Sequence, residues 1–64
     1  MINHLRQRRQ ELNLTQKQVA DRVGIAESSY QRYERNARLP IVNMAVRIAK
    51  ALETTVEELY IEDE

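Results

Sequence analysis

The chain of 64 residues contains no cysteine, which excludes disulfides, thiolate nucleophiles and cysteine zinc sites. It also has no apolar segment close to the ~20 residues that a membrane-spanning helix needs. Its N-terminus shows no apolar run of signal-peptide length. These absences predict a cytoplasmic protein without membrane contact.

Glycine and proline occur only once each, and no stretch alternates between apolar and polar residues as a half-buried strand would. Polar helix-forming residues are abundant instead. A chain this short buries only ~60% of its unfolded surface, so it must be regular and compact in order to fold. The composition therefore predicts one all-α domain over residues 1–64.

The formal net charge is zero, but the two halves of the chain differ in sign. Residues 1–38 hold eight basic and four acidic side chains, a net charge of +4, whereas residues 39–64 hold two basic and six acidic ones, a net charge of −4. A run of charges can simply be a solvated face. The asymmetry is more informative, because it places the positive potential on the N-terminal half, where phosphate would bind.

Residues for catalysis and for metal binding are missing as well. His4 is the only histidine, and no carboxylate stands near it at ligand spacing, so we assign it no metal. Glu57 and Glu58 are explained by the first turn of a helix, whose dipole they complement. With no nucleophile beside a base and no phosphate-binding glycine loop, we expect a protein that is not an enzyme and uses no cofactor or small-molecule ligand.

The stretch from residue 15 to residue 34 predicts two short helices around the only glycine. Thr15 and Gln18 have the spacing of a capping box, which marks a helix start. Apolar residues then recur at helical spacing until Gly24, which suits a left-handed helix end. A second helical pattern begins near Ala26. Helix, tight turn and helix over residues 15–35 form a helix-turn-helix unit.

Three further helices are predicted around this unit. Residues 2–12 form the first, since apolar residues recur there every three or four positions. Pro40 starts a helix that runs to about residue 52, because its fixed φ suits a first turn. Thr55 caps a last short helix, and residues 61–64 form an acidic tail. In the helix after Pro40, Arg47 is expected to point away from a buried face formed by Val42, Ala45, Ile48, Ala49 and Leu52.

Arg9 falls within the apolar stripe of the first helix, where a cation must reach solvent or pair with a buried anion. Glu34, on the inward side of the second helix of the unit, is the natural partner. The alternative is a partly exposed Arg9 whose stem covers the core. Tyr30 and Tyr33 share the inward side with Glu34, so we expect them in the core and not as stacking platforms.

An ordered set of residues runs through the whole chain: Arg9, Leu14–Gln16, Val19–Ala20, Val23–Ile25, Tyr30, Tyr33–Arg35, Pro40, Ile48–Leu52, Thr55 and Glu58–Tyr60. Each element is common alone, but the ordered set resembles the lambda-repressor-like helix-turn-helix family, the Cro and Xre type of regulators. Three positions depart from the family pattern, and one of them is Glu27 at the DNA face, which phosphate would repel unless it accepts a hydrogen bond from a cytosine N4 amine. Ala26 cannot supply the usual Ser or Thr N-cap oxygen, a loss of ~1 kcal/mol, and Glu53 stands where the family favours glycine.

The resemblance implies a compact five-helix domain that binds double-stranded DNA by sequence, as a transcriptional regulator such as a repressor does. Its third helix, over about residues 26–35, would enter the major groove. The resemblance places Gln16 at a phosphate and places Glu27, Ser28 and Arg32 at base edges. It also implies the pairing of Arg9 with Glu34.

The pattern of the third helix adds further DNA contacts. Gln31 joins the base-reading residues, while Ser29, Arg35 and Arg38 join the phosphate-contacting ones. Arg32 is the first choice for a base contact, because bidentate arginine to guanine is the commonest specific contact; a phosphate clamp is the alternative. The alternative function is a helical protein-interaction module, antitoxin-like or adaptor, without DNA readout.

We expect a homodimer on a palindromic operator, because one helix reads only a few base pairs. Val56, Leu59, Tyr60 and Ile61 are more apolar residues than a short terminal helix can turn inward, so they predict the dimer interface. A two-fold interface there would set the recognition helices ~34–36 Å apart. The alternative is that these residues close the core of the monomer.

Overall fold

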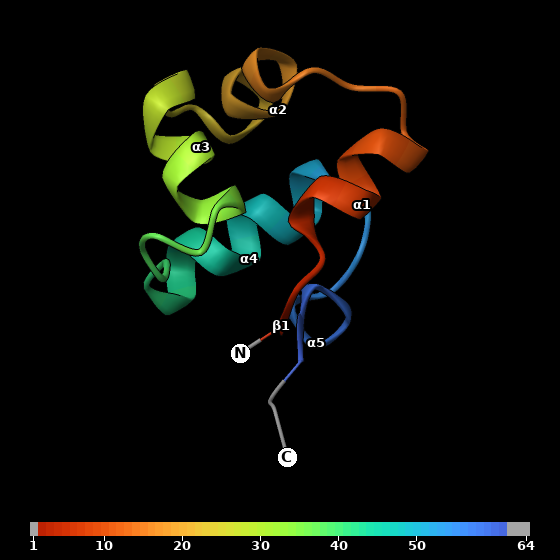
Figure 1. Ribbon diagram of the computed structural model, residues 1–64, viewed down its shortest axis with the longest axis vertical. Coiled ribbons are helices and arrows are strands. Elements are labelled where there is room, and N and C mark those ends of the chain that lie inside the picture. Colours follow the sequence, from red (N-terminus) through yellow and green to blue (C-terminus); the bar gives the residue numbers. More distant parts are fainter. Residues whose placement is uncertain (1, 62–64) are drawn as a thin grey trace.

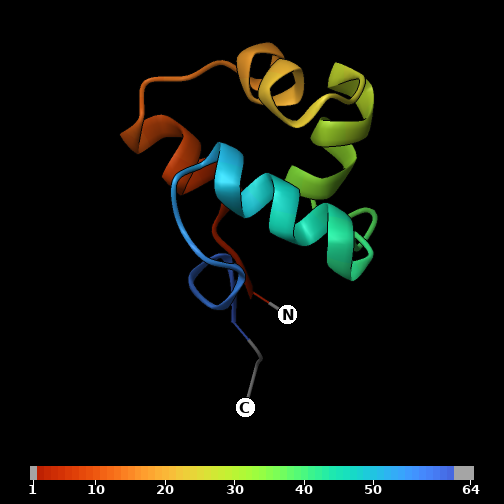
Figure 2. The same ribbon diagram turned by 180° about the vertical axis from the view of Figure 1, so that it is seen from behind.

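The computed structural model describes residues 2–61, and five short helices make up most of this segment (Figures 1 and 2). The elements are, in chain order, β1 (Ile2–Asn3), α1 (Leu5–Glu11), α2 (Gln16–Val23), α3 (Glu27–Glu34), α4 (Val42–Ala51), α5 (Val56–Leu59) and β2 (Tyr60–Ile61). The predicted five-helix fold is confirmed. The antiparallel pair of β1 and β2 is an addition that the all-α prediction missed. The expected acidic tail lies outside the described residues, apart from Ile61, which is in β2.

The sequence predicts that the first helix begins at Ile2, but in the structure it begins at Leu5. Ile2 and Asn3 instead pair with Ile61 and Tyr60. The Asn3 carboxamide oxygen accepts a hydrogen bond from the Leu5 N–H at 2.7 Å, which satisfies a free donor at the helix start. Apolar spacing alone could not reveal this start, because the strand partner lies at the far end of the chain.

The helix-turn-helix unit begins and turns where the sequence predicts. The Thr15 side chain accepts from the Gln18 N–H at 3.1 Å, and the Gln18 side chain accepts from the Thr15 N–H at 2.8 Å, which completes the capping box. Gly24 ends α2 with a φ of +86°, a left-handed conformation that favours glycine. α3 begins after Ala26, whose side chain makes no capping hydrogen bond.

The fourth helix begins two residues after the predicted start. Pro40 lies before the helix, and Ile41 occupies the N-cap position with an extended backbone. Val42 is therefore the first helical residue, and it is 78% exposed, although the sequence placed it on the buried face. The other four residues expected on that face are buried: Ala45, Ile48, Ala49 and Leu52.

The core forms where α2, α3 and α4 meet. α2 packs against both α3 and α4, while α1 contacts α3 and α5 contacts α4. Figure 2 shows α4 crossing below α2 and α3. Tyr30 of α3 is fully buried and Tyr33 packs half-buried against the core, so the inward side of α3 is fixed as predicted. The buried residues are Leu5, Val19, Ala20, Val23, Tyr30, Ala45, Ile48, Ala49, Leu52 and Leu59.

An arginine of α1 holds the turn that follows α4. Glu53 has a φ of +57°, a left-handed conformation that is unfavourable for a residue with a side chain. Arg8 donates from Nε to the Leu52 carbonyl and from Nη2 to the Glu53 carbonyl, both at 2.9 Å. These two bonds satisfy carbonyls at the end of α4 and stabilise the turn where the sequence lacks the glycine of the family.

Candidate nucleic-acid interface

α4 fixes the turn between α2 and α3 through one arginine. Arg47 donates from Nη2 to the Val23 carbonyl at the end of α2. A Cβ added at Gly24 would lie 3.0 Å from the same nitrogen. The expectation that Arg47 points away is therefore wrong, because its head group docks on a helix C-terminus, where a cation is favoured. α4 thus helps to set how α3 is placed relative to α2.

The outward face of α3 carries polar side chains that the fold itself does not use. Glu27, Ser28 and Arg32 are exposed, and their side chains make no hydrogen bond or ion pair within residues 2–61. Ser29 and Gln31 are half-buried on the same helix. Since Tyr30 anchors the opposite side, α3 presents these side chains on a fixed support.

A groove between α1, α2 and α3 is lined by Arg6, Arg9, Gln16, Glu34 and Arg35. The exposed side chains of Arg6 and Arg35 make no ion pair or hydrogen bond with any described residue, so both charges are available to an anion. Gln16 and Arg35 were expected at phosphate from the sequence, whereas Arg6 was not. Its spacing was the usable signal, since residues three apart on a helix lie on the same face.

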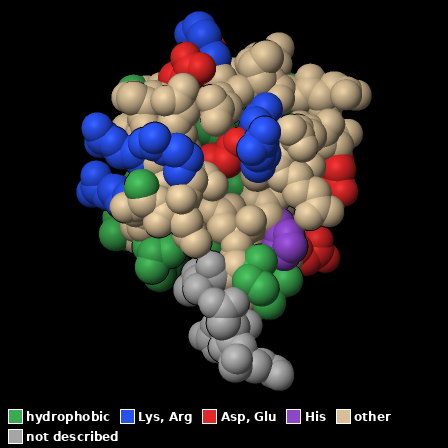
Figure 3. Space-filling view, in the orientation of Figure 1, with side chains coloured by type: hydrophobic (Ala, Val, Ile, Leu, Met, Phe, Trp, Pro, Cys, Tyr) green, Lys and Arg blue, Asp and Glu red, His purple; other side chains and the backbone are tan. Residues whose placement is uncertain are grey.

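The remaining expected phosphate contacts do not line this groove. Ser29 lies in the first turn of α3, and Arg38 lies exposed in the loop after α3. Figure 3 shows Lys and Arg side chains gathered over α3 and this loop, at the left of the view. Hydrophobic side chains lie directly beside them, where α4 begins. The cationic surface therefore continues from the groove along α3 and borders an apolar one.

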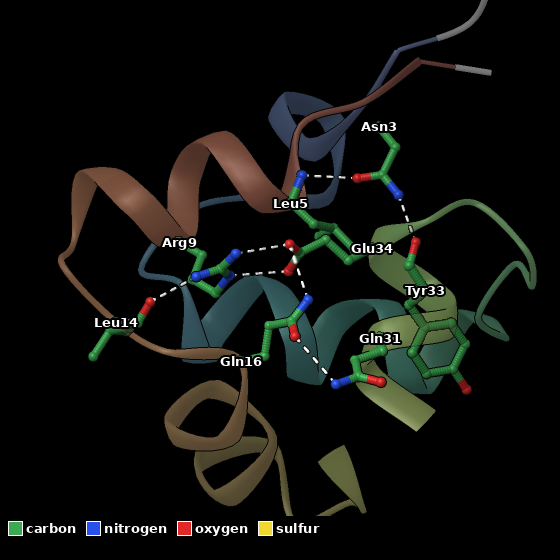
Figure 4. A network of polar contacts seen from close by, with 8 residues as sticks. All are labelled: Asn3, Leu5, Arg9, Leu14, Gln16, Gln31, Tyr33 and Glu34. Atoms are coloured by element: carbon green, nitrogen blue, oxygen red, sulfur yellow. Dashed lines mark hydrogen bonds and ion pairs between the residues drawn. The ribbon is translucent and has the colours of Figure 1, made fainter. Parts of the chain in front are cut away.

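Arg9 and Glu34 form the ion pair that the sequence predicts, and it joins α1 to α3 (Figure 4). Arg9 donates from Nη2 to Oε1 of Glu34 at 2.9 Å and from Nε to Oε2 at 3.0 Å. Its Nη1 donates to the Leu14 carbonyl at 2.9 Å. The side chains are 14% and 4% exposed, so Arg9 pairs with a buried anion, although it keeps a little of the exposure that the alternative of a partly exposed Arg9 expects.

The pair and its surroundings shift three pKa values. Burial alone would raise the pKa of Glu34, but hydrogen bonds from Arg9 and Gln16 and the charge of Arg9 hold it below its ordinary value. The hydrogen bond to Glu34 raises the pKa of Arg9 against the effect of burial. Burial, and then the charge of Glu34, raise the pKa of Tyr30. The Tyr30 hydroxyl faces Glu34 without a hydrogen bond of normal geometry, so the ionised carboxylate relies mainly on Arg9 and Gln16.

Within the described residues, no group of three His, Asp or Glu side chains could hold a metal ion. His4 hydrogen bonds to Gln7 through its Nδ1 at 3.1 Å. Over the same residues, no helix is long and apolar enough to cross a membrane.

The residues assigned to the dimer interface do not form one exposed face. Leu59 is 1% exposed and belongs to the core, and Val56 and Tyr60 are half-buried against it. The helix also ends at Leu59, so Tyr60 and Ile61 extend as β2. The reasoning from helical spacing was therefore wrong for this segment, and only Ile61 of the four is exposed.

The most exposed large apolar side chains lie at the start of α4 instead. They belong to Leu39, Ile41 and Val42, with Val46 one turn further along the helix. A groove beside them runs between α4 and α5 and reaches Val56 and Tyr60. We call these four residues the apolar patch: Leu39, Ile41, Val42 and Val46. The signal in the sequence was the apolar run around Pro40, which exceeds what one helix face can bury.

A tight helical pair with a buried inner side, a free polar outer side and a cationic groove defines a helix-turn-helix domain of the nucleic-acid-binding kind. A family described as helix-turn-helix matches residues 5–59, which include all five helices. The chain belongs to this family, as its resemblance to the Cro and Xre type predicts.

Several curated proteins are similar to the chain. The cryptic phage CTXphi transcriptional repressor RstR of Vibrio cholerae serotype O1 is 44% identical over 55 residues, which cover 86% of this chain and 49% of the repressor. An HTH-type transcriptional regulator of Methanothermobacter thermautotrophicus is 38% identical over 61 residues, with 94% and 88% covered. The HTH-type transcriptional regulator YobD of Bacillus subtilis is 38% identical over 53 residues, with 83% and 47% covered. The chain spans about half the length of two of these relatives.

Proposed function

We propose that this chain is a DNA-binding transcriptional regulator that recognises double-stranded DNA by sequence, with α3 in the major groove. The observation that carries the proposal is the outward face of α3, where the side chains of Glu27, Ser28 and Arg32 are free and lie next to a groove with two unpaired arginines. The helix-turn-helix family and the regulators among its relatives support it. A DNA duplex offers base edges to the polar side chains of α3 and phosphates to the arginines of the groove.

Base readout falls to Glu27, Ser28, Gln31 and Arg32. Arg32 matches the two acceptors that guanine presents in the major groove, which makes it the principal base contact. Glu27 is repelled by phosphates, so it needs the N4 amine of a cytosine as a donor. These two side chains together favour a site with G·C pairs opposite α3, with Glu27 in its first turn and Arg32 in its last.

Phosphate contacts fall to Gln16, Ser29, Arg35 and Arg38, and the groove adds Arg6 to this set. Arg6 and Arg35 approach the same groove from α1 and α3, so one phosphate there can accept from both guanidinium groups. Such contacts fix the position of the protein on the duplex without reading its sequence.

Selection from random-sequence duplexes, followed by a salt titration on the enriched site, tests this function. We expect an enriched sequence and an affinity that falls with salt, with a logarithmic slope of about −0.9 for each phosphate neutralised. A selection that enriches no sequence contradicts the proposal. The Arg6→Ala variant should lower the slope by about one unit.

The regulator acts as a homodimer on a palindromic operator, and a second copy of the chain covers the apolar patch. The patch replaces the α5 residues as the expected interface because it is contiguous and exposed. Removing such a patch from water stabilises the two-fold pair. The patch borders the cationic surface over α3, so a second copy bound there would lie beside the proposed DNA-contacting face of the first.

One observation favours the alternative of an antitoxin-like or adaptor module, namely the same apolar patch. In that case a different protein covers the patch, and α3 reads no DNA. The duplex selection separates the two functions, because only a DNA-reading protein enriches a sequence. Under both functions we expect a cytoplasmic protein without enzymatic activity.

A further inference from the structure

Two glutamine amides connect the buried Glu34 to the outer side of α3 (Figure 4). Gln16 donates from Nε2 to Oε1 of Glu34 at 3.3 Å. Gln31 donates from Nε2 to Oε1 of Gln16 at 3.2 Å. All three side chains are half-buried or more, so the two amides are held inside a packed junction of α2 and α3.

The direction of this hydrogen-bond chain is fixed by charge. Glu34 is ionised and bound to Arg9 through both oxygens, so it can only accept hydrogen bonds. Gln16 must therefore turn its NH₂ group toward Glu34, which leaves its carbonyl oxygen toward Gln31. That oxygen in turn requires the NH₂ group of Gln31. Reversing either amide would place two oxygens, or two NH₂ groups, against each other.

This fixed direction determines what Gln31 offers to a partner. Figure 4 shows the carbonyl oxygen of Gln31 on the side of its amide that points away from Gln16. The free edge therefore combines this acceptor with the second N–H of the same amide. Adenine presents the complementary pair in the major groove, an N6 amine and an N7 acceptor, whereas guanine presents two acceptors.

We propose that Gln31 reads an adenine and that Gln16 is the positioning residue that fixes its amide for this purpose. The inference rests on the proposed function, since it needs α3 in the major groove. Glu34, through Gln16, thereby sets a base preference although it is buried. A glutamine without this support could turn its amide over, and it would then distinguish adenine from guanine less well.

The test uses the full chain and the site obtained by selection. Affinity is measured for the selected duplex and for all three replacements at each base pair, with the wild type, Gln31→Ala and Gln16→Ala. We expect one adenine position at which Gln31→Ala abolishes a preference of about 5-fold to 150-fold over guanine. Gln16→Ala should reduce that ratio severalfold at the same position and leave the ratio at the Arg32 position unchanged.

Two further variants keep the test decisive. Gln16→Met retains the side-chain volume without an amide, so it should reproduce the loss of preference even if Gln16→Ala loosens the fold. Gln10→Ala removes an exposed glutamine of α1 and should leave every ratio unchanged. If the wild type enriches no sequence, the proposed function fails and this inference with it. If the wild type selects a site but Gln31→Ala affects no adenine, or both Gln16 variants keep the wild-type ratio, only this inference is overturned.

Discussion

The α1–α3 junction and the start of α4 expose side chains on neighbouring parts of the surface, but in different ways. At the junction, the buried charges of Arg9 and Glu34 satisfy each other, and the exposed arginines around them are free. At the start of α4, the described residues leave the apolar patch exposed. The junction therefore positions a few donors and acceptors, whereas the apolar patch can only gain free energy by being covered.

This difference separates two properties of the protein. In our proposal, stability and base preference depend on directional contacts at the junction, which one substitution can break. Self-association, in the same proposal, depends on the area of the patch, over which single substitutions have smaller effects. The following changes test this separation, from the largest expected effect to the smallest.

Glu34→Ala should destabilise the fold most, because it leaves the Arg9 cation buried without a partner. We expect a loss of ~3–5 kcal/mol in the free energy of unfolding, measured by chemical denaturation. Combining it with Arg9→Leu should cost less than the sum of the two single changes. Exposed Glu57 is the control, and Glu57→Ala should stay within ~0.5 kcal/mol. Equal losses at Glu34 and Glu57 would contradict the role of the pair.

Acid should remove part of the same stabilisation. The pKa of Glu34 lies below its ordinary value of 4.5, so its ionised form stabilises the fold above that pH. This contribution is lost as the pH falls through the lower pKa of the folded state. Thermal unfolding between pH 3 and 7 measures it, and Glu34→Gln should lack this part of the pH dependence. A Glu34→Gln profile identical to the wild type would exclude Glu34 as its source.

Arg32→Ala should cost ~1–3 kcal/mol of binding free energy on the selected site and relax the preference at one base pair. Arg38→Ala should weaken binding to all sequences alike and reduce the salt slope by about one unit. Titrations of specific and random duplexes at several salt concentrations distinguish the two. If Arg32→Ala lowers both affinities equally, Arg32 belongs to the phosphate contacts.

Ala26→Ser should stabilise the protein by ~1 kcal/mol, because it supplies the missing N-cap oxygen of α3. Chemical denaturation measures the gain. Ala37→Ser is the matched control, since Ala37 is exposed in the loop after α3 and caps no helix. A serine that stabilises both positions equally would show that the cap is not the cause.

Val42→Ser should change the free energy of unfolding by no more than ~0.5 kcal/mol, because Val42 is exposed. It should nevertheless reduce self-association, which light scattering at micromolar concentration measures. Ile61→Ser is the matched control at the end of the chain that the sequence had favoured. If only Ile61→Ser reduces the measured mass, the interface lies at β2 and not at the apolar patch.

Features with a local cause could be predicted from the sequence. The capping box at Thr15 and the left-handed Gly24 each depend on residues within one turn. The Arg9–Glu34 pair was also predictable. A charge within an apolar stripe requires a partner of opposite charge, and Glu34 was the acid expected on the inward side of the second helix of the helix-turn-helix unit. The proposed DNA contacts on α3 rest on the same kind of spacing and stay predictions.

Features that join distant residues could not be predicted in this way. The docking of Arg8 on Glu53 and of Arg47 on Val23 depends on how α4 lies against the other helices. The hydrogen bond between Gln16 and Gln31 could not be predicted from the sequence pattern either, because a neutral amide is as stable in water as it is in a hydrogen bond within the protein. A neutral polar side chain does not require a partner as a buried charge does, so only the structure shows which residue it bonds to.

The carboxamide of Asn3 makes the two ends of the described chain depend on α3. Its oxygen caps α1, its nitrogen donates to the Tyr33 carbonyl at 2.6 Å, and its backbone pairs with Tyr60 (Figure 4). If β2 separates from β1, Asn3 loses its backbone partner. We expect its side-chain hydrogen bonds to the start of α1 and to the last turn of α3 to weaken as a result. The amide protons of β2 and of the end of α3 should then exchange with solvent at a common opening free energy, as one cooperative unit. Fraying of the chain ends is thereby coupled to the order of the helix that contacts DNA in our proposal.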